Sequence, residues 1–158
     1  MAEGKQLDLC EPYAIELPDG KIICHLRAQR YAAGEAAYFT TYQSESADGG
    51  KTWSEPHPIL ARLGGAPSHL LLHSSGILVA TYGHREMPYG IKAMFSRDGG
   101  ATWDAGYDIY TDTVSGDLGY PCSVELADQS ILTVFYAHEK EGGPAVIMQQ
   151  KWRIEDEI

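Results

Sequence analysis

Short apolar runs separated by turn-forming residues make up the pattern of this chain. Three segments open alike, each with a proline in its second position, and they begin at Glu11, Ala66 and Tyr120. Each segment meets a turn rich in Pro, Asp, Ser or Gly, and a second apolar run, a polar loop and a third run follow. Runs of this length bounded by such turns predict β-strands. The strands expected are 11–17, 21–26 and 38–43, then 66–72, 77–82 and 91–96, then 120–126, 130–136 and 145–150.

One eight-residue phrase occurs twice, at Ser46–Trp53 and, 50 residues later, at Ser96–Trp103. Its Asp can accept hydrogen bonds from nearby backbone N–H groups, and its two glycines supply the positive φ values that other residues resist. We interpret each copy as a tight structural turn, rather than a ligand site, between a third strand and a short fourth one. The third repeat lacks this phrase: only Gln149–Trp152 stands at the corresponding place, and an acidic tail follows.

A period near 50 residues with four short strands per unit is typical of β-propeller blades. We expect an all-β fold of about three four-stranded antiparallel blades, at about 10–60, 64–111 and 118–154, in one partial propeller domain over 1–158. Three blades would leave unpaired edges. The chain is therefore expected to be a fragment, or to be completed by a second copy in a homodimer or by a partner chain.

The charge and the cysteine content of the chain limit the kinds of ligand and partner that it is expected to bind. The formal net charge of −10 leaves no Lys/Arg stripe for nucleic acid, so an anionic ligand must be held by a few arginines. No stretch is apolar enough to span a membrane, and Met1–Gln6 lacks a signal-peptide core, which favours a cytoplasmic location. Cys10, Cys24 and Cys122 are interpreted as small buried thiols. A zinc site of Cys24, His25 and a distant cysteine is the weaker alternative, and we expect no metal and no cofactor.

The end of the propeller opposite the repeated turns is the expected place for chemistry. In an up-and-down blade, the loops between second and third strands share that end with the connections between blades. Loops on a rigid β-scaffold are the usual location of binding sites. This rim gathers 27–34, 83–90, 137–143 and the lead-in to Tyr120. Its polar set is Arg27, Arg30, His84, Arg85, Glu86, Tyr120 and His138.

The two repeated phrases resemble the Asp-box (BNR) repeats of sialidases. In addition, the segment from Gly119 to Tyr136 is similar to the last part of sialidase-like six-bladed propellers. The resemblance runs from about Cys10 to Trp152 and matches the C-terminal half of such proteins. It implies a glycoside hydrolase that recognises a sugar acid such as sialic acid through clustered arginines. It also implies a tyrosine nucleophile, because an anionic Asp or Glu would be repelled by the sugar's carboxylate.

Carried over by position, the resemblance makes Tyr120 the candidate nucleophile, Arg85 the candidate carboxylate-binding residue and Arg27 a second one. Structural alternatives stand beside each: an aromatic plug for Tyr120, an ion pair of Arg85 with Glu86 or an acidic neighbour, and a solvated loop position for Arg27. We expect Glu125 to be structural, and His84 and His138 to be hydrogen-bonded loop residues. The loop acid of sialidases has no match here, and the glutamate partner of the tyrosine is not assigned.

Three functional hypotheses follow. The chain is a sialidase-like fragment that is inactive or feeble alone, unless two copies build a shared pocket. Alternatively, it is a non-catalytic propeller module that binds a glycan or a protein partner. A third option is a truncated gene product without activity.

Overall fold

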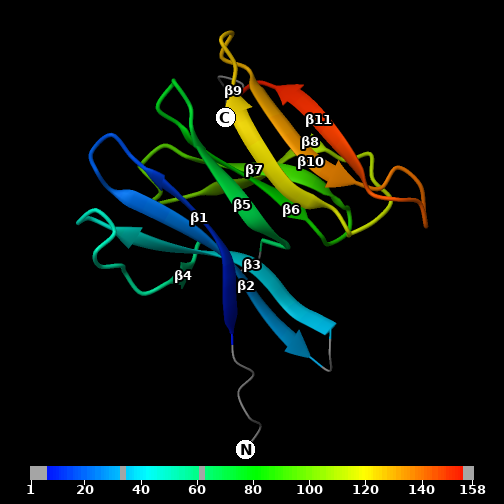
Figure 1. Ribbon diagram of the computed structural model, residues 1–158, viewed down its shortest axis with the longest axis horizontal. Helices are drawn as coiled ribbons and strands as arrows, with labels where there is room; N and C mark the ends of the chain where they lie inside the picture. Colours follow the sequence, from blue (N-terminus) through cyan, green and yellow to red (C-terminus); the bar gives the residue numbers. More distant parts are fainter. Residues whose placement is uncertain (1–6, 33–34, 61–62, 155–158) are drawn as a thin grey trace, which may run out of the picture.

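The computed structural model describes residues 7–32, 35–60 and 63–154. Within them the chain forms eleven strands, arranged in three separate antiparallel sheets (Figure 1). The strands are β1 (Asp8–Glu16), β2 (Ile22–Ala32), β3 (Glu35–Ser46), β4 (His57–Pro58), β5 (Gly65–Leu72), β6 (Leu78–His84), β7 (Gly90–Ser96), β8 (Asp104–Tyr110), β9 (Gly119–Glu125), β10 (Ile131–Ala137) and β11 (Val146–Trp152). In this described part no helix is long and apolar enough to cross a membrane.

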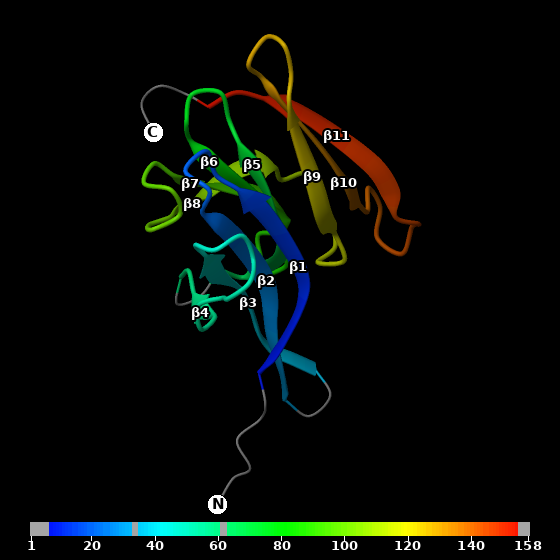
Figure 2. The ribbon, with the colours of Figure 1, turned by 60° about the vertical axis from the view of Figure 1, so that its left-hand side comes forward.

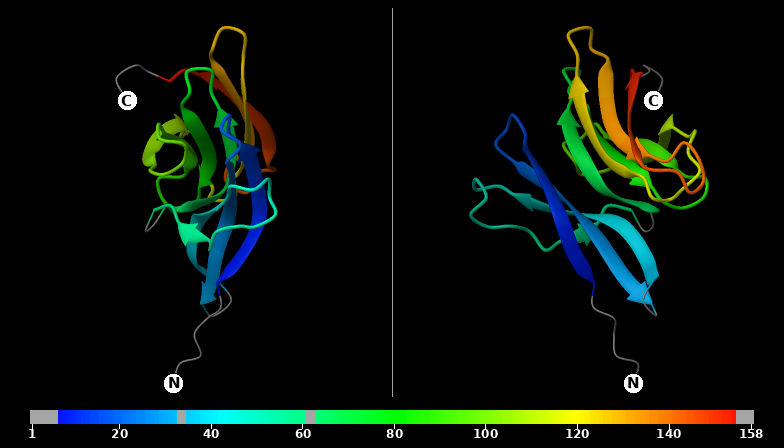
Figure 3. Two further views of the ribbon diagram at one scale, coloured as in Figure 1. Left: turned by 90° about the vertical axis from the view of Figure 1, so that its left-hand side faces the viewer. Right: turned by 45° about the vertical axis from the view of Figure 1, so that its right-hand side comes forward.

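Each sheet takes its strands in sequence order. The first sheet is β1-β2-β3-β4, the second is β5-β6-β7-β8, and the third is β9-β10-β11. The three sheets lie side by side in sequence order, with the second between the first and the third (Figures 2 and 3). The opening strand β5 lies against both β1 and β9, so the three opening strands share one side of the molecule. The prediction of an all-β fold of propeller blades is confirmed.

Two apolar layers hold the sheets together. Between the first and second sheets lies a cluster that includes Ile23, Leu70 and Met94, all fully buried. Between the second and third sheets, Phe95 and Ile131 are buried together with neighbouring apolar residues. Because the second sheet lies between two neighbours, both of its faces are covered, and nearly every residue of β6 and β7 is buried.

A buried polar cluster also joins the first sheet to the second. The imidazole of His25 lies 2.8 Å from Ser68 Oγ through Nδ1 and 3.2 Å from Gln43 Oε1 through Nε2. Trp103 Nε1 donates to the same Gln43 oxygen at 2.9 Å. Since an amide oxygen only accepts, Nε2 carries the imidazole proton and Nδ1 accepts from Ser68. Burial lowers the pKa of His25 to about 4.

The two repeated turns satisfy their own polar groups. Asp48 accepts from Thr52 N at 2.9 Å and from Thr52 Oγ1 at 2.6 Å. Asp98 accepts from Thr102 at the same two distances. These hydrogen bonds, with those from Ser46 and Ser96, lower the pKa of each carboxyl to about 2. Both carboxylates are thus engaged within their own turns, as expected of structural turns.

Two expectations from the sequence are wrong. The loop expected at 27–34 is mostly strand, because β2 continues to Ala32 and pairs Arg27 with Thr41 and Arg30 with Tyr38 of β3. The expectation followed the end of the apolar run, but ladder hydrogen bonds use backbone groups and need no apolar side chains. Residues 33–34 lie outside the described part. The cysteines are not all buried: Cys24 is, whereas Cys122 is exposed on β9.

Candidate functional site

The opening strands β1, β5 and β9 share an irregularity at the same point of the repeat, next to the proline. The strand register shifts between Cys10 and Tyr13 in β1 and between Gly65 and Ser68 in β5, and it shifts opposite the start of β9. At this point Glu11 has φ 51° and Tyr120 has φ 47°, in the left-handed region that L-residues rarely adopt. Such backbone outliers gather at functional sites. The bends turn both side chains toward one another.

Tyr120 and Glu11 form the centre of the site. The phenol of Tyr120 donates a hydrogen bond to Glu11 Oε1 at 2.6 Å, across 109 positions of sequence. Arg27 Nη1 lies 3.3 Å from both carboxylate oxygens of Glu11. The Arg27 side chain is largely buried, so the solvated-loop alternative is wrong. Tyr120 is half exposed.

A second arginine, Arg85, lies beside Tyr120. The guanidinium carbon of Arg85 is 6.0 Å from the centre of the Tyr120 ring and 5.6 Å from that of Phe39. Arg27 lies over the same Phe39 ring at 4.4 Å, so both cations lie close to one aromatic ring. The Nε atoms of both arginines are buried and make no hydrogen bond within the described residues. The site therefore holds two arginines around one phenol.

Arg85 belongs to a chain of polar contacts that runs away from Tyr120. Its Nη2 donates to the Tyr136 hydroxyl at 3.4 Å, and Tyr136 donates to Asp117 Oδ1 at 2.7 Å. The other oxygen of Asp117 lies 3.1 Å from His138 Nε2, and His138 Nδ1 lies 2.8 Å from the Gly143 carbonyl. Through these contacts Asp117 and Tyr136 hold the guanidinium of Arg85 in place. Arg85 is therefore linked to the Asp117 carboxylate through the hydroxyl group of Tyr136.

The charges around the site act on the titration of its groups. The hydrogen bond to Glu11, together with partial burial, raises the pKa of Tyr120, while Arg27 and Arg85 act to lower it. Hydrogen bonds from Tyr136 and His138 lower the pKa of Asp117. The phenol of Tyr120 is therefore neutral at neutral pH, with a carboxylate already placed to accept its proton.

A groove of about 210 Å³ opens beside the pair. It is lined by residues of the three opening strands, including Glu11, Tyr13, His69 and Tyr120. The ring of Tyr13 lies 4.4 Å from that of His69 along this wall. Aromatic walls of this kind suit the apolar face of a sugar ring, and the carboxylate and arginines supply the few polar groups that orient a ligand.

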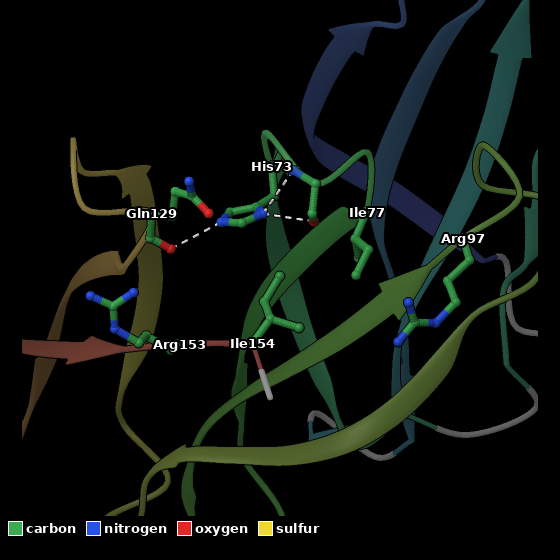
Figure 4. Close-up of a pocket in the computed structure, with 7 residues that line it drawn as sticks. His73, Ile77, Arg97, Gln129, Arg153 and Ile154 are labelled. Atoms are coloured by element: carbon green, nitrogen blue, oxygen red, sulfur yellow. Dashed lines mark hydrogen bonds between the residues drawn. The ribbon is translucent and has the colours of Figure 1, made fainter. Parts of the chain in front are cut away.

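A larger cavity of about 350 Å³ lies among the turns at the other end of the second and third sheets (Figure 4). Its residues make contacts that already use their polar groups: His73 contacts Ser75 and the Gln129 carbonyl, and Arg153 donates to Asp128. The cavity holds none of the rim residues. We therefore place the candidate site at Tyr120.

The remaining rim residues have structural partners or lie apart. His84 Nδ1 lies 3.0 Å from the Pro88 carbonyl, and Arg30 is exposed on β2. Glu125 accepts hydrogen bonds from the Ser74 N–H at 2.8 Å and from its hydroxyl, far from the phenol. His84 and His138 are hydrogen-bonded as expected, but His84 is the last residue of β6 and not a loop residue. No group of three metal-binding side chains occurs in the residues that the structure describes.

Two residues of the site were missed by sequence analysis. Glu11 supplies the carboxylate partner of Tyr120, and Phe39 lies under both arginines. A signal for Glu11 was present, since it precedes Pro12 as Tyr120 precedes Pro121. Aligning the prolines would have placed both on corresponding bends. No pattern marks Phe39, because its role depends on the pairing of Phe39 with Gln29 in the extended β2–β3 hairpin.

Successive antiparallel sheets with a polar rim define a propeller-like domain. The chain belongs to the family of BNR repeat-like domains, whose model matches residues 2–132. Among curated protein sequences none matches.

Solved structures agree with this fold. A protein of unknown function from Dyadobacter fermentans is 27% identical, with a TM-score of 0.78 over 98% of this chain and 40% of that one. The intramolecular trans-sialidase from Ruminococcus gnavus, complexed with oseltamivir carboxylate, is 20% identical, with a TM-score of 0.58 over 91% of this chain and 32% of that one. An α-L-arabinanase from Penicillium chrysogenum, complexed with arabinobiose, is 17% identical, with a TM-score of 0.64 over 92% and 46%. The chain thus spans less than half the length of these three proteins.

Proposed function

We propose that this chain carries the tyrosine half of a sialidase-like glycoside hydrolase site, which binds a sugar acid such as sialic acid. One observation carries the proposal: the Tyr120 phenol donates to the Glu11 carboxylate at 2.6 Å, with Arg27 beside the carboxylate and Arg85 beside the phenol ring. The glycoside hydrolases among the similar structures, including the trans-sialidase, support a carbohydrate ligand by analogy of fold.

Each side chain has a distinct part in the proposed reaction. The guanidinium groups of Arg85 and Arg27 bind the sugar's carboxylate, for which a planar fork of donors is well suited. The Tyr120 oxygen attacks the anomeric carbon while Glu11 accepts the phenol proton. The bond from that carbon to the leaving oxygen breaks, and the leaving group departs with the electron pair. Water then hydrolyses the tyrosyl–sugar bond and regenerates the phenol.

A neutral nucleophile suits this substrate. A carboxylate nucleophile would approach a carbon that already bears a carboxylate, and the two anions would repel each other. The raised pKa of Tyr120 keeps the phenol neutral until Glu11 removes its proton. The arginines favour the phenolate as it forms, because they lower the same pKa.

The leaving group decides how the activity should be tested. No residue of this chain is assigned as the general acid that protonates a leaving alcohol, a contribution of roughly 10²- to 10⁴-fold. An aryl sialoside with a fluorescent phenol as leaving group needs little protonation. We expect slow release of that phenol by the full chain, and loss of release in Tyr120→Phe.

Tyr107→Phe is the matched control, since the Tyr107 hydroxyl also donates to a carboxylate, that of Asp104, but on β8 away from the site. We expect this variant to keep the release rate. Glu11→Gln should lower the rate roughly 10²-fold or more, because it removes the proton acceptor. Equal rates for Tyr120→Phe and the parent chain would overturn the nucleophile assignment. Binding of sialic acid without release, and unchanged in Tyr120→Phe, would instead support a non-catalytic glycan-binding module.

A further inference from the structure

The third sheet carries apolar residues on both faces. Ile131, Phe135 and their neighbours face the second sheet and are buried. The alternate residues point away from it: Val124 is 52% exposed and Ile147 77%, with Val134 exposed between them. An antiparallel sheet with one face in water normally carries polar residues on that face. The free face of the third sheet carries Cys122, Val124, Leu132, Val134 and Ile147, and also Tyr136 and the polar Gln149 and Lys151. Its apolar residues form a continuous group over β9 and β10, which is unusual for a face left in water.

The contacts of Trp103 and Trp152 show how one sheet covers the face of its neighbour. Trp103, which ends the second repeated turn, packs on the first sheet, with its ring 4.9 Å from His25 and its Nε1 bonded to Gln43. Trp152 of the third sheet in turn lies 6.2 Å from Phe95 of the second. Each later sheet therefore rests a tryptophan on the sheet before it.

Trp53 breaks this rule. It ends the first repeated turn with the same internal hydrogen bonds, yet it is 45% exposed and its Nε1 donates only to Gly50 of its own turn. A Cβ at Gly50 would meet nothing nearer than Ile22 and Trp53 at 3.9 Å, whereas one at Gly100 would lie 2.4 Å from Ile23 of the preceding sheet. The first sheet thus presents a tryptophan that no preceding sheet receives among the described residues.

We propose that two copies of this chain assemble head to tail, with the Trp53 side of one first sheet seated on the free face of the other copy's third sheet. The contact continues the packing that already joins the first sheet to the second and the second to the third. Two copies of three sheets give six, which lies within the 4–8 blades of known propellers. The head-to-tail contact then closes after two steps into a ring with twofold symmetry.

The proposed contact also bears on the site. Tyr120 opens β9 on the free face, next to Cys122 and Val124 along the same side of the strand. The first sheet of the second copy would therefore border the groove at Tyr120. The assembly itself rests on packing alone and stands whether or not the site is catalytic.

The molar mass of the full chain in solution, measured by sedimentation over a wide range of concentration, tests the assembly. We expect twice the chain mass of 17.3 kDa. Trp53→Asp and Ile147→Asp should each weaken association roughly tenfold or more, because a buried charge would replace an apolar contact on one side of the interface. Met87→Asp is the control, since Met87 is 75% exposed in the β6–β7 loop, away from both faces. Circular dichroism verifies that all three variants are folded.

An equimolar mixture of Trp53→Asp and Ile147→Asp gives the sharpest result. In a mixed ring, one interface carries both substitutions and the other carries neither, so the mixture should recover dimer that each variant alone lacks. A monomeric parent chain would overturn the proposal, and so would a mixture that stays monomeric. A dimer that Ile147→Asp breaks and Trp53→Asp leaves intact would mean that two third sheets face each other, which also excludes the ring.

Discussion

Protonation of His25 should destabilise the fold by an amount that the structure sets. The imidazole is buried between Ser68 and Gln43, and burial lowers its pKa from 6.5 to about 4. The unfolded chain therefore takes up a proton at a higher pH than the folded one. The stabilising contribution is complete above pH 6.5 and is lost as the pH falls through about 4. At about 1.4 kcal/mol per pH unit, the total is roughly 3 kcal/mol, most of it lost by about pH 4.5.

Urea unfolding at about pH 7.5 and about pH 4.5 measures this loss, at one protein concentration because self-association would add to the stability. His25→Gln is the comparison, since an amide can still donate to Gln43 and accept from Ser68 but does not titrate. The variant should be less stable than the parent at the higher pH, and the gap should narrow by roughly 2 to 3 kcal/mol at the lower pH. The titration of the other histidines affects the free energy of unfolding of parent and variant alike, so it cancels in the difference between the two chains.

Two curves that stay parallel between these pH values would refute the reasoning. They would mean that His25 is solvated or already paired with an acid in the folded chain. The hydrogen bonds between the first two sheets would then need reassignment, beginning with the proton on Nε2.

Gly50→Ala and Gly100→Ala impose the same backbone strain, since both glycines have φ 83°, but only the second brings a Cβ within 2.4 Å of Ile23. Thermal unfolding should show a loss of about 1 kcal/mol for Gly50→Ala and about 1–3 kcal/mol more for Gly100→Ala, and equal losses would contradict the packing described. In Asp117→Asn, the pKa of His138, which the Gly143 carbonyl and Asp117 both raise, should fall toward 6.5, because a neutral amide no longer favours the imidazolium. Imidazole NMR shifts against pH measure it, and an unchanged pKa would show that Asp117 has no part in it.

The repeat made the fold predictable from sequence. Apolar runs and the twice-used turn identified the strands because turn chemistry and period-two burial are local properties. The extension of β2 past Leu26 could not be read in this way, since Arg27 to Arg30 pair through backbone groups and bury no apolar run. The exposure of Cys122 likewise depends on which face of the third sheet lacks a neighbour.

The site was predictable only in part. Tyr120, Arg85 and Arg27 come together as the rim geometry and the family resemblance suggested. The link from Glu11 to Tyr120 spans 109 positions and depends on a left-handed bend at each end, which no hydrophobic pattern encodes. The assignment of functions to these residues stays a prediction until the release assay is done.

The bends at Glu11 and Tyr120 have a consequence for engineering. Each holds a bulky L-residue in a conformation that glycine adopts freely, at a cost of roughly 1–3 kcal/mol. Glycine at either position would relax the chain while deleting half of the phenol–carboxylate contact. Selection for thermal stability should therefore favour glycine at positions 11 and 120. The stabilised variants would be those without the hydrogen bond between Tyr120 and Glu11.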